Sequence, residues 1–170
     1  MKIPLLIRPL CAAGFFLLIP LAQAASVPML ECKLLAPSIA KVGQPVMLGF
    51  SLHNRSTQDV WVLAWNTPLE GLRGRFLTVR GPAGELAYQG PMFKRGTPQP
   101  VDYRKLIAGQ TLQVEVDMGL VYDMGKPGPY TVRYTGQLHD VVVGAVPAPG
   151  GKLHAQPLHC PGVAFKLLPV

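Results

Sequence analysis

Apolar and polar residues alternate along several short stretches of this chain. Within residues 45–54, Val46, Leu48, Phe50 and Leu52 occupy every second position. A period of two puts these four side chains on one face, which predicts a half-buried β-strand. The same reasoning predicts further strands at 29–35, 59–65, 75–80, 85–89, 111–118, 130–134, 141–146 and 162–168.

The segments between these stretches are rich in turn-forming residues. The chain has 18 Gly and 18 Pro, and no segment shows a useful helical period. Short strands with frequent turns predict an all-β fold, a single-domain immunoglobulin-like antiparallel sandwich. Tyr130 follows a Pro-Gly-Pro turn, so its hydroxyl is expected to bond back to the chain upstream. Trp61, Leu63 and Trp65 are expected to share one face, with the two tryptophans in the core.

The first residues predict a secretory signal peptide. Lys2 and Arg8 precede an apolar run at 11–20, and Ala22-Gln23-Ala24 matches a cleavage site. A transmembrane anchor is the alternative, but Pro20 and Gln23 interrupt the run, which falls short of about 20 apolar residues. We therefore expect a signal peptide at 1–24, a mature domain at 25–170, and a periplasmic or secreted protein.

Two cysteines, Cys32 and Cys160, remain after signal cleavage. In an oxidising compartment a pair of this kind predicts a disulfide. Such a bond would join the first strand to the start of the last. Two free buried thiols are the alternative.

The mature chain is mildly basic. Of the 16 Lys and Arg residues two lie in the predicted signal peptide, which leaves 14 against nine Asp and Glu, a net charge of +5. The only adjacent basic pairs are Lys94-Arg95 and Arg104-Lys105. Because no long basic run is present, we expect no nucleic-acid partner. No later segment is long and apolar enough to span a membrane, so we expect no membrane contact after signal cleavage. An acidic protein partner or an anionic surface fits the charge better, and solubility alone is the alternative.

No arrangement of residues typical of an enzyme is found. No serine lies in Gly-x-Ser-x-Gly and no histidine in His-Glu-x-x-His. His154 and His159 lie near Cys160, so a zinc site there is an alternative, although zinc usually needs four convergent ligands. We expect a protein that is not an enzyme, with no metal and no cofactor.

The most distinctive exposed segment is predicted at Met92-Phe93-Lys94-Arg95. Two large apolar residues precede two cations where no strand pattern exists. Pro91 and Pro98 flank the segment and restrict it, which lowers the entropy cost of binding. We predict that these four residues contact a partner. The alternative is a solvated loop with Phe93 packed against the core.

With these residues in view, a family pattern can be described. Residues about 30–134 resemble the N-terminal domain of the deuterolysin-like peptidyl-Lys metalloendopeptidases, the aspzincin zinc proteases. The resemblance rests on Asn54, Trp65-x-Thr67-Pro68-Leu69-Glu70-Gly71, Tyr88-x-Gly90-Pro91-Met92-x-Lys94-Arg95, Pro98, Asp102-Tyr103, Gly109-x-Thr111-Leu112-x-Val114-x-Val116-Asp117, Tyr122-Asp123 and Pro127-Gly128-x-Tyr130-Thr131-Val132-x-Tyr134.

In that family a catalytic domain with His-Glu-x-x-His follows, and this sequence contains no such motif. The chain therefore resembles a stand-alone pro-region. The resemblance implies an immunoglobulin-like domain that inhibits, or assists the folding of, a lysine-specific zinc endopeptidase by presenting a lysine to its pocket. Lys94 matches best, with Arg95 and Lys105 as rivals. The alternative function is an envelope interaction or adhesion module that has no protease partner.

Overall fold

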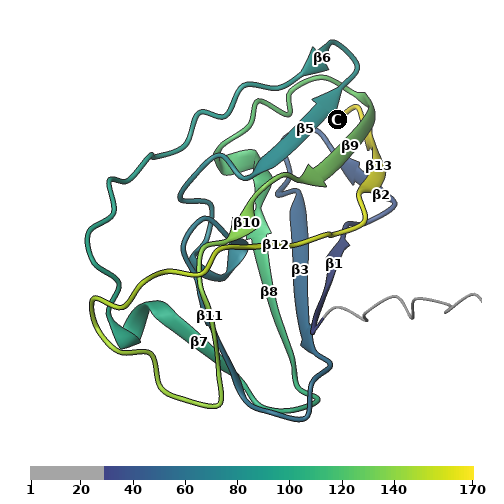
Figure 1. Cartoon of the computed structure of the whole chain (residues 1–170). Coiled ribbons are helices and arrows are strands. Elements are labelled where there is room, and N and C mark those ends of the chain that lie inside the picture. Colours follow the sequence, from purple (N-terminus) through teal and green to yellow (C-terminus); the bar gives the residue numbers. More distant parts are fainter. Residues whose placement is uncertain (1–28) are drawn as a thin grey trace, which may run out of the picture.

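The computed structural model describes residues 29–170, in which thirteen strands and three short 3₁₀ helices are found and no α-helix (Figure 1). The predicted signal peptide lies outside the described residues. Within the described range, no helix has the length and apolar character needed to cross a membrane.

The strands form four sheets. The first has the order β1-β3-β8 (Leu30–Leu35, Met47–Asn54, Thr111–Asp117). The largest has the order β2-β13-β9-β5-β6 (Ile39–Lys41, Val163–Leu168, Gly128–Tyr134, Leu77–Gly81, Gly84–Glu85). A third has the order β11-β4-β7 (Val141–Val143, Val60–Leu63, Tyr103–Leu106), and β10 pairs with β12 (Gln137–Leu138, Gln156–Pro157). The 3₁₀ helices are η1 (Pro68–Glu70), η2 (Pro100–Asp102) and η3 (Met118–Leu120).

All of these strand pairs are antiparallel except β2 with β13, so the predicted all-β fold with antiparallel sheets is confirmed. The alternation predicted for β3 is also present, because Leu48, Phe50 and Leu52 are fully buried. These three residues face the interior that the first sheet shares with the five-stranded sheet, where the ring centroids of Phe50 and Tyr134 lie 6.0 Å apart.

The predicted disulfide is present. Cys32 on β1 is bonded to Cys160, which precedes β13, with the two Cα atoms 4.8 Å apart. The bond ties the first sheet to the five-stranded sheet across 128 positions of sequence. In the chain-entropy account, closing so long a loop contributes about 4–5 kcal/mol to stability.

The turn predicted before Tyr130 is confirmed as well. The Tyr130 hydroxyl donates a 2.7 Å hydrogen bond to the carbonyl of Lys126, four residues upstream. The ring stacks on Phe165 of β13 with centroids 5.3 Å apart. Tyr130 therefore fastens the turn that starts β9 to the core beneath it.

The prediction for the tryptophans is wrong. Val60, Val62 and Leu63 are fully buried, whereas Trp61 and Trp65 are half-buried. The strand ends at Leu63, so the alternation that would have placed Trp65 beside it stops there. Both indole rings instead lie against cations of neighbouring segments.

Several strand assignments also differ from the sequence prediction, and the short strands β2, β10 and β12 were not predicted. Residues 103–106, expected to be a connection, form β7 because their backbone pairs with β4. The strand expected at 85–89 shrinks to Gly84–Glu85 in β6. Beyond this hairpin the chain leaves the sheet edge and runs without strand structure to η2.

Candidate functional site

Residues 86–99 connect β6 to η2 and are called the strap here. Figure 1 shows the strap running down one side of the molecule, well away from β2 and β13 on the other side. Its first part is anchored, because the backbone N–H of Leu86 bonds to the carbonyl of Val79 and that of Gln89 to Val121, both at 2.8 Å. The predicted segment Met92–Arg95 lies in its middle.

Tyr88, in the first half of the strap, connects the strap to the body of the protein. Its hydroxyl oxygen lies 2.8 Å from the carbonyl of Leu72 and 2.9 Å from that of Pro91, so one proton serves two acceptors. The ring meets Tyr122 edge-on, with centroids 5.7 Å apart. Burial raises the pKa of Tyr88, which keeps the phenol a neutral donor well into the alkaline range.

Arg95 turns back onto the body of the protein. Its Nη2 atom lies 2.6 Å from Oε1 of Glu70, and the two side chains are only 23% and 10% exposed. The same carboxylate oxygen accepts the backbone N–H of Asn66 at 2.8 Å. Because both groups are largely withdrawn from water, this ion pair anchors the strap more firmly than a surface pair does.

The corner at residues 65–71 holds Glu70 in place. Asn66 adopts a positive φ of 55°, which turns the chain sharply. Thr67 then caps η1, since its hydroxyl accepts from the N–H of Leu69 at 3.1 Å and donates to the carbonyl of Ala64 at 2.7 Å. Pro68 begins the helix and Gly71, with a φ of 83°, ends it. Glu70 is thereby aimed at the strap.

Four side chains from three segments form what we call the cation–aromatic stack. The guanidinium of Arg95 lies 5.3 Å from the ring centroids of both Trp65 and Phe93. The guanidinium of Arg73 lies 5.5 Å from the Phe93 centroid. Phe93 is thus held by cations rather than packed into the core, where one alternative from the sequence would have placed it.

Lys94 and Met92 remain on the outside of the strap. Met92 is 72% and Phe93 49% exposed, and Lys94 is also exposed. Among the ion pairs formed by residues 29–170, none includes Lys94. The four predicted residues therefore divide into an exposed group at positions 92–94 and Arg95 at their base.

The region considered for zinc has other bonding partners. Cys160 is committed to the disulfide, and the backbone N–H of His154 bonds to Oδ1 of Asp140 at 2.9 Å. Oδ2 of this buried carboxylate accepts the hydroxyl of Tyr103 at 2.7 Å. Burial first, and then this hydrogen bond, raise the pKa of Tyr103. Across residues 29–170 no three His, Cys, Asp or Glu side chains gather in a way that could hold a metal ion.

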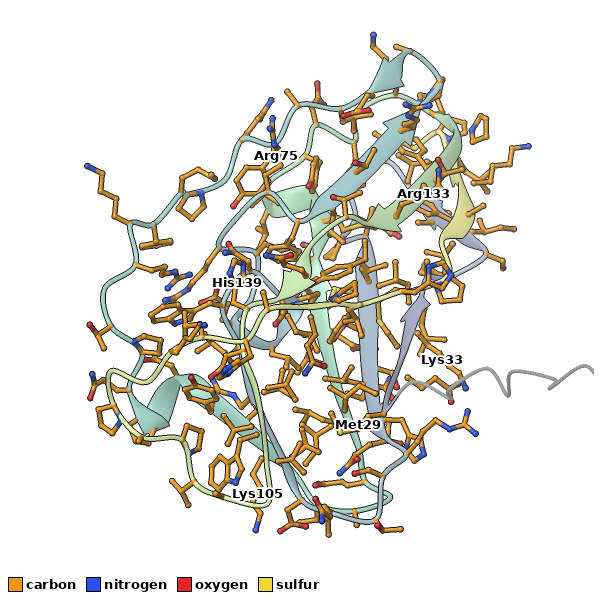
Figure 2. All side chains as sticks on the ribbon, in the orientation of Figure 1. Met29, Lys33, Arg75, Lys105, Arg133 and His139 are labelled. Carbon is orange, nitrogen blue, oxygen red and sulfur yellow. A yellow bond between two sulfur atoms is a disulfide. The ribbon has the colours of Figure 1, made fainter. Side chains whose placement is uncertain are left out.

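His139, labelled in Figure 2, contacts the corner at residues 65–71. Its Nε2 atom lies 2.9 Å from Nδ2 of Asn66. The hydroxyl of Tyr134 donates to the carbonyl of Asn66 at 3.3 Å. These contacts secure the residue whose unusual backbone sets the direction of the corner.

Sequence reasoning missed Glu70, Trp65 and Arg73 as parts of this site. In the structure the corner at residues 65–71, which contains Trp65 and Glu70, lies beside the strap. A Trp and a Glu at the two ends of a Pro-containing corner were the available signal. Nothing in the linear pattern indicated which of the cations they would hold.

No family model matches this sequence. The chain is similar to a protein from Aeromonas hydrophila described as "Extracellular protease", with 29% identity over 129 residues, which is 76% of this chain and 32% of that protein. The chain therefore spans about a third of the length of the curated relative it matches. This similarity fits a secreted, protease-related domain.

Among solved structures, one similar chain is the Pseudomonas fluorescens alkylpurine DNA glycosylase AlkC bound to DNA containing an abasic site analog. The sequence identity is 16%, and the match covers 84% of this chain and 31% of the other, with a TM-score of 0.33. At that score the match does not define the fold of this chain.

Proposed function

We propose that this chain is a non-catalytic binding protein of the periplasm or the extracellular space, related to a protease pro-region. Its partner is a lysine-specific zinc endopeptidase, which it inhibits or helps to fold. The observation that carries the proposal is the strap, which presents Lys94 beside exposed Met92 and Phe93 while Arg95 is tied to Glu70. The similarity to an extracellular protease supports a partner or ancestor of that class.

The proposal includes an immunoglobulin-like sandwich as the scaffold. Two sheets of orders β1-β3-β8 and β2-β13-β9-β5-β6, which pack on a shared interior, support this assignment. The bond from Tyr130 to Lys126 at the start of β9 supports the same assignment. On this scaffold the β11-β4-β7 sheet and the strap are additions that extend from one side.

The mechanism is substrate mimicry. The Lys94 ammonium enters an acidic specificity pocket, and Met92 and Phe93 fill neighbouring apolar subsites. Because the stack and the Tyr88 bonds hold the strap before binding, little chain entropy is lost on association. The same restraint opposes the strap adopting the geometry that cleavage requires, so the segment acts as an inhibitor rather than a substrate.

The test is a titration of the chain from Ala25 onward into a peptidyl-Lys zinc endopeptidase that is cleaving a lysine-containing peptide. Truncating one partner of a buried charge pair costs about 2–5 kcal/mol, so Lys94→Ala should weaken inhibition roughly thirtyfold or more. Lys41→Ala is the matched control, since Lys41 is an exposed lysine on β2, away from the strap (Figure 1).

Saturable inhibition that Lys94→Ala removes and Lys41→Ala keeps would support the proposal. Inhibition that survives Lys94→Ala would refute substrate mimicry. Absence of any complex with the wild-type chain would refute the protease partner and favour an envelope interaction module instead.

A further inference from the structure

The most exposed cation of the cation–aromatic stack is Arg73, to which the resemblance to a pro-region gives no role. Arg73 lies in the connection between η1 and β5 and is exposed. Its guanidinium contacts Phe93 of the strap, at 5.5 Å from the ring centroid. We infer that Arg73 is a second partner contact, which binds a carboxylate on the protease surface beside the lysine pocket; this inference rests on the proposed function.

The two guanidiniums that lie against Phe93 differ in their electrostatic environment. Arg95, the less exposed of the two, is neutralised by Glu70 at 2.6 Å. Arg73, which is exposed, takes part in no ion pair with the carboxylates of residues 29–170. The exposed end of the stack therefore carries an uncompensated positive charge next to Lys94.

Stacking prepares Arg73 for a carboxylate ligand. A guanidinium lying over an aromatic ring keeps its N–H groups available at the edge of its plane. These donors match the two oxygens of a carboxylate, and the planar group is already ordered, so less rotamer entropy is lost on binding. Arginine beside an exposed aromatic ring is a composition typical of the residues that dominate protein interfaces.

Charge complementarity identifies the occupant. Arg73, Met92, Phe93 and Lys94 are all exposed, and Arg73 lies against Phe93, so two cations accompany two apolar side chains here. A surface that fits these side chains has an apolar cleft with acidic groups on two sides. A protease whose pocket selects lysine already carries one of these acidic groups, which would bind Lys94. The second acidic group would bind Arg73.

The experiment measures the inhibition constant of four variants of the chain from Ala25 onward against the peptidyl-Lys zinc endopeptidase. Arg73→Gln removes the charge, and Arg73→Met also removes it but keeps an apolar stem over Phe93. Arg133→Gln is the control, an exposed arginine on β9 at a distance from the strap (Figure 2). Lys94→Ala reports on the proposed function itself.

We expect Arg73→Gln and Arg73→Met each to weaken inhibition about tenfold, and Arg133→Gln to change it less than twofold. The dependence of the inhibition constant on salt should also become less steep in both Arg73 variants. A loss with Gln but not with Met would overturn the inference, because Arg73 would then serve only to pack Phe93.

Equal losses with Arg73→Gln and Arg133→Gln would also overturn it, since long-range attraction would explain both. If Lys94→Ala abolishes inhibition while both Arg73 variants match the wild type, the inference fails and the proposed function stands. If the wild-type chain does not inhibit at all, the proposed function fails and this inference with it.

Discussion

The two adjacent basic pairs of this chain, Lys94-Arg95 and Arg104-Lys105, use the same chemistry in different settings. In each pair one cation meets a carboxylate and a tryptophan: Arg95 meets Glu70 and Trp65, and Lys105 meets Asp59 and Trp61. In the strap pair the ion-paired side chains are 23% and 10% exposed, whereas in the β7 pair they are 45% and 39% exposed.

The remaining cation of each pair also differs. Arg104 donates to the carbonyls of Val101 and Tyr103, so it is used within its own segment. Lys94 forms no ion pair within residues 29–170. On β7 backbone pairing with β4 holds the chain, so the side chains add little. Beyond Gln89 the strap forms no backbone bond with a strand in the described residues, so side chains hold it there, and the Arg95–Glu70 ion pair is one of these contacts.

The largest expected difference comes from removing the two carboxylates. Glu70→Ala leaves Arg95 without its partner and the N–H of Asn66 without its acceptor, so the free energy of unfolding should fall by about 2–3 kcal/mol. Asp59→Ala should produce no measurable loss, because its ion pair is exposed. Urea unfolding measures both. Equal losses would show that burial does not separate the two pairs.

A smaller difference is expected from the two tryptophans. Trp65→Ala removes the inner surface of the stack, so the strap should open more often and trypsin should cut after Lys94 or Arg95 several times faster. Trp61→Ala is the matched control and should not change cleavage in the strap, because Trp61 contacts Lys105. Mass spectrometry of timed digests locates the cuts. Faster strap cleavage in both variants would point to a general loss of stability.

The response to salt should separate the pairs further. In 1 M salt the screening length falls to about 3 Å, which weakens exposed pairs most. Double-mutant cycles should therefore find that the coupling of Lys105 with Asp59 vanishes, while about 1 kcal/mol or more remains between Arg95 and Glu70. If salt removes both couplings, the strap pair is solvated and does not anchor the strap.

The tyrosines of the two regions, Tyr88 and Tyr103, should change the pH dependence of stability least near neutral pH. In alkali their effect on stability should be clear. Burial raises the pKa of Tyr88 behind the strap and of Tyr103 in β7 above the ordinary value of 10.0. A raised folded-state pKa gives stability that is complete below the unfolded-state pKa and is lost as pH rises through the folded one.

Stability should therefore be flat up to about pH 9 and should fall above pH 10. Tyr122, whose pKa burial raises to about 12, adds to the same loss. Absorbance at 295 nm and urea midpoints across pH 8–12 follow the phenols and the unfolding together. Tyr88→Phe and Tyr103→Phe should each reduce the alkaline loss. Phenols that titrate freely near pH 10 in the folded protein would contradict the burial of these groups.

Much of the fold was predictable because strand patterns are local. The period of two in β3 and β8 defined both strands, and their pairing of Leu52 with Leu112 follows from matching apolar faces. The turn before Tyr130 was also predictable from the sequence. The end of β4 at Leu63 was not, because Ala64 and Trp65 continue the apolar run beyond the residue at which the strand ends.

For the site, the sequence identified the segment but not its internal division. Two apolar residues and two cations between prolines marked Met92–Arg95 as unusual. Their order along the chain contains no information on which cation faces a carboxylate. That depends on the position of Glu70, which is 25 residues from Arg95 in sequence and 2.6 Å away in space.

By itself, the sequence determined the all-β class, the pairing of Cys32 with Cys160 and the location of an apolar and basic segment outside the strands. The all-β class and the place of the segment follow from periodicity and composition, which are local properties of the sequence. The cysteine pairing follows because only two cysteines remain after the predicted signal cleavage. Only the tertiary structure decided that Arg95 is the anchor, that Phe93 lies against the guanidiniums of Arg73 and Arg95, and that Lys94 is exposed. Such outcomes depend on burial and charge pairing between segments that are distant in sequence. The energies of these contacts are decided by the tertiary placement of the corner at residues 65–71 beside the strap.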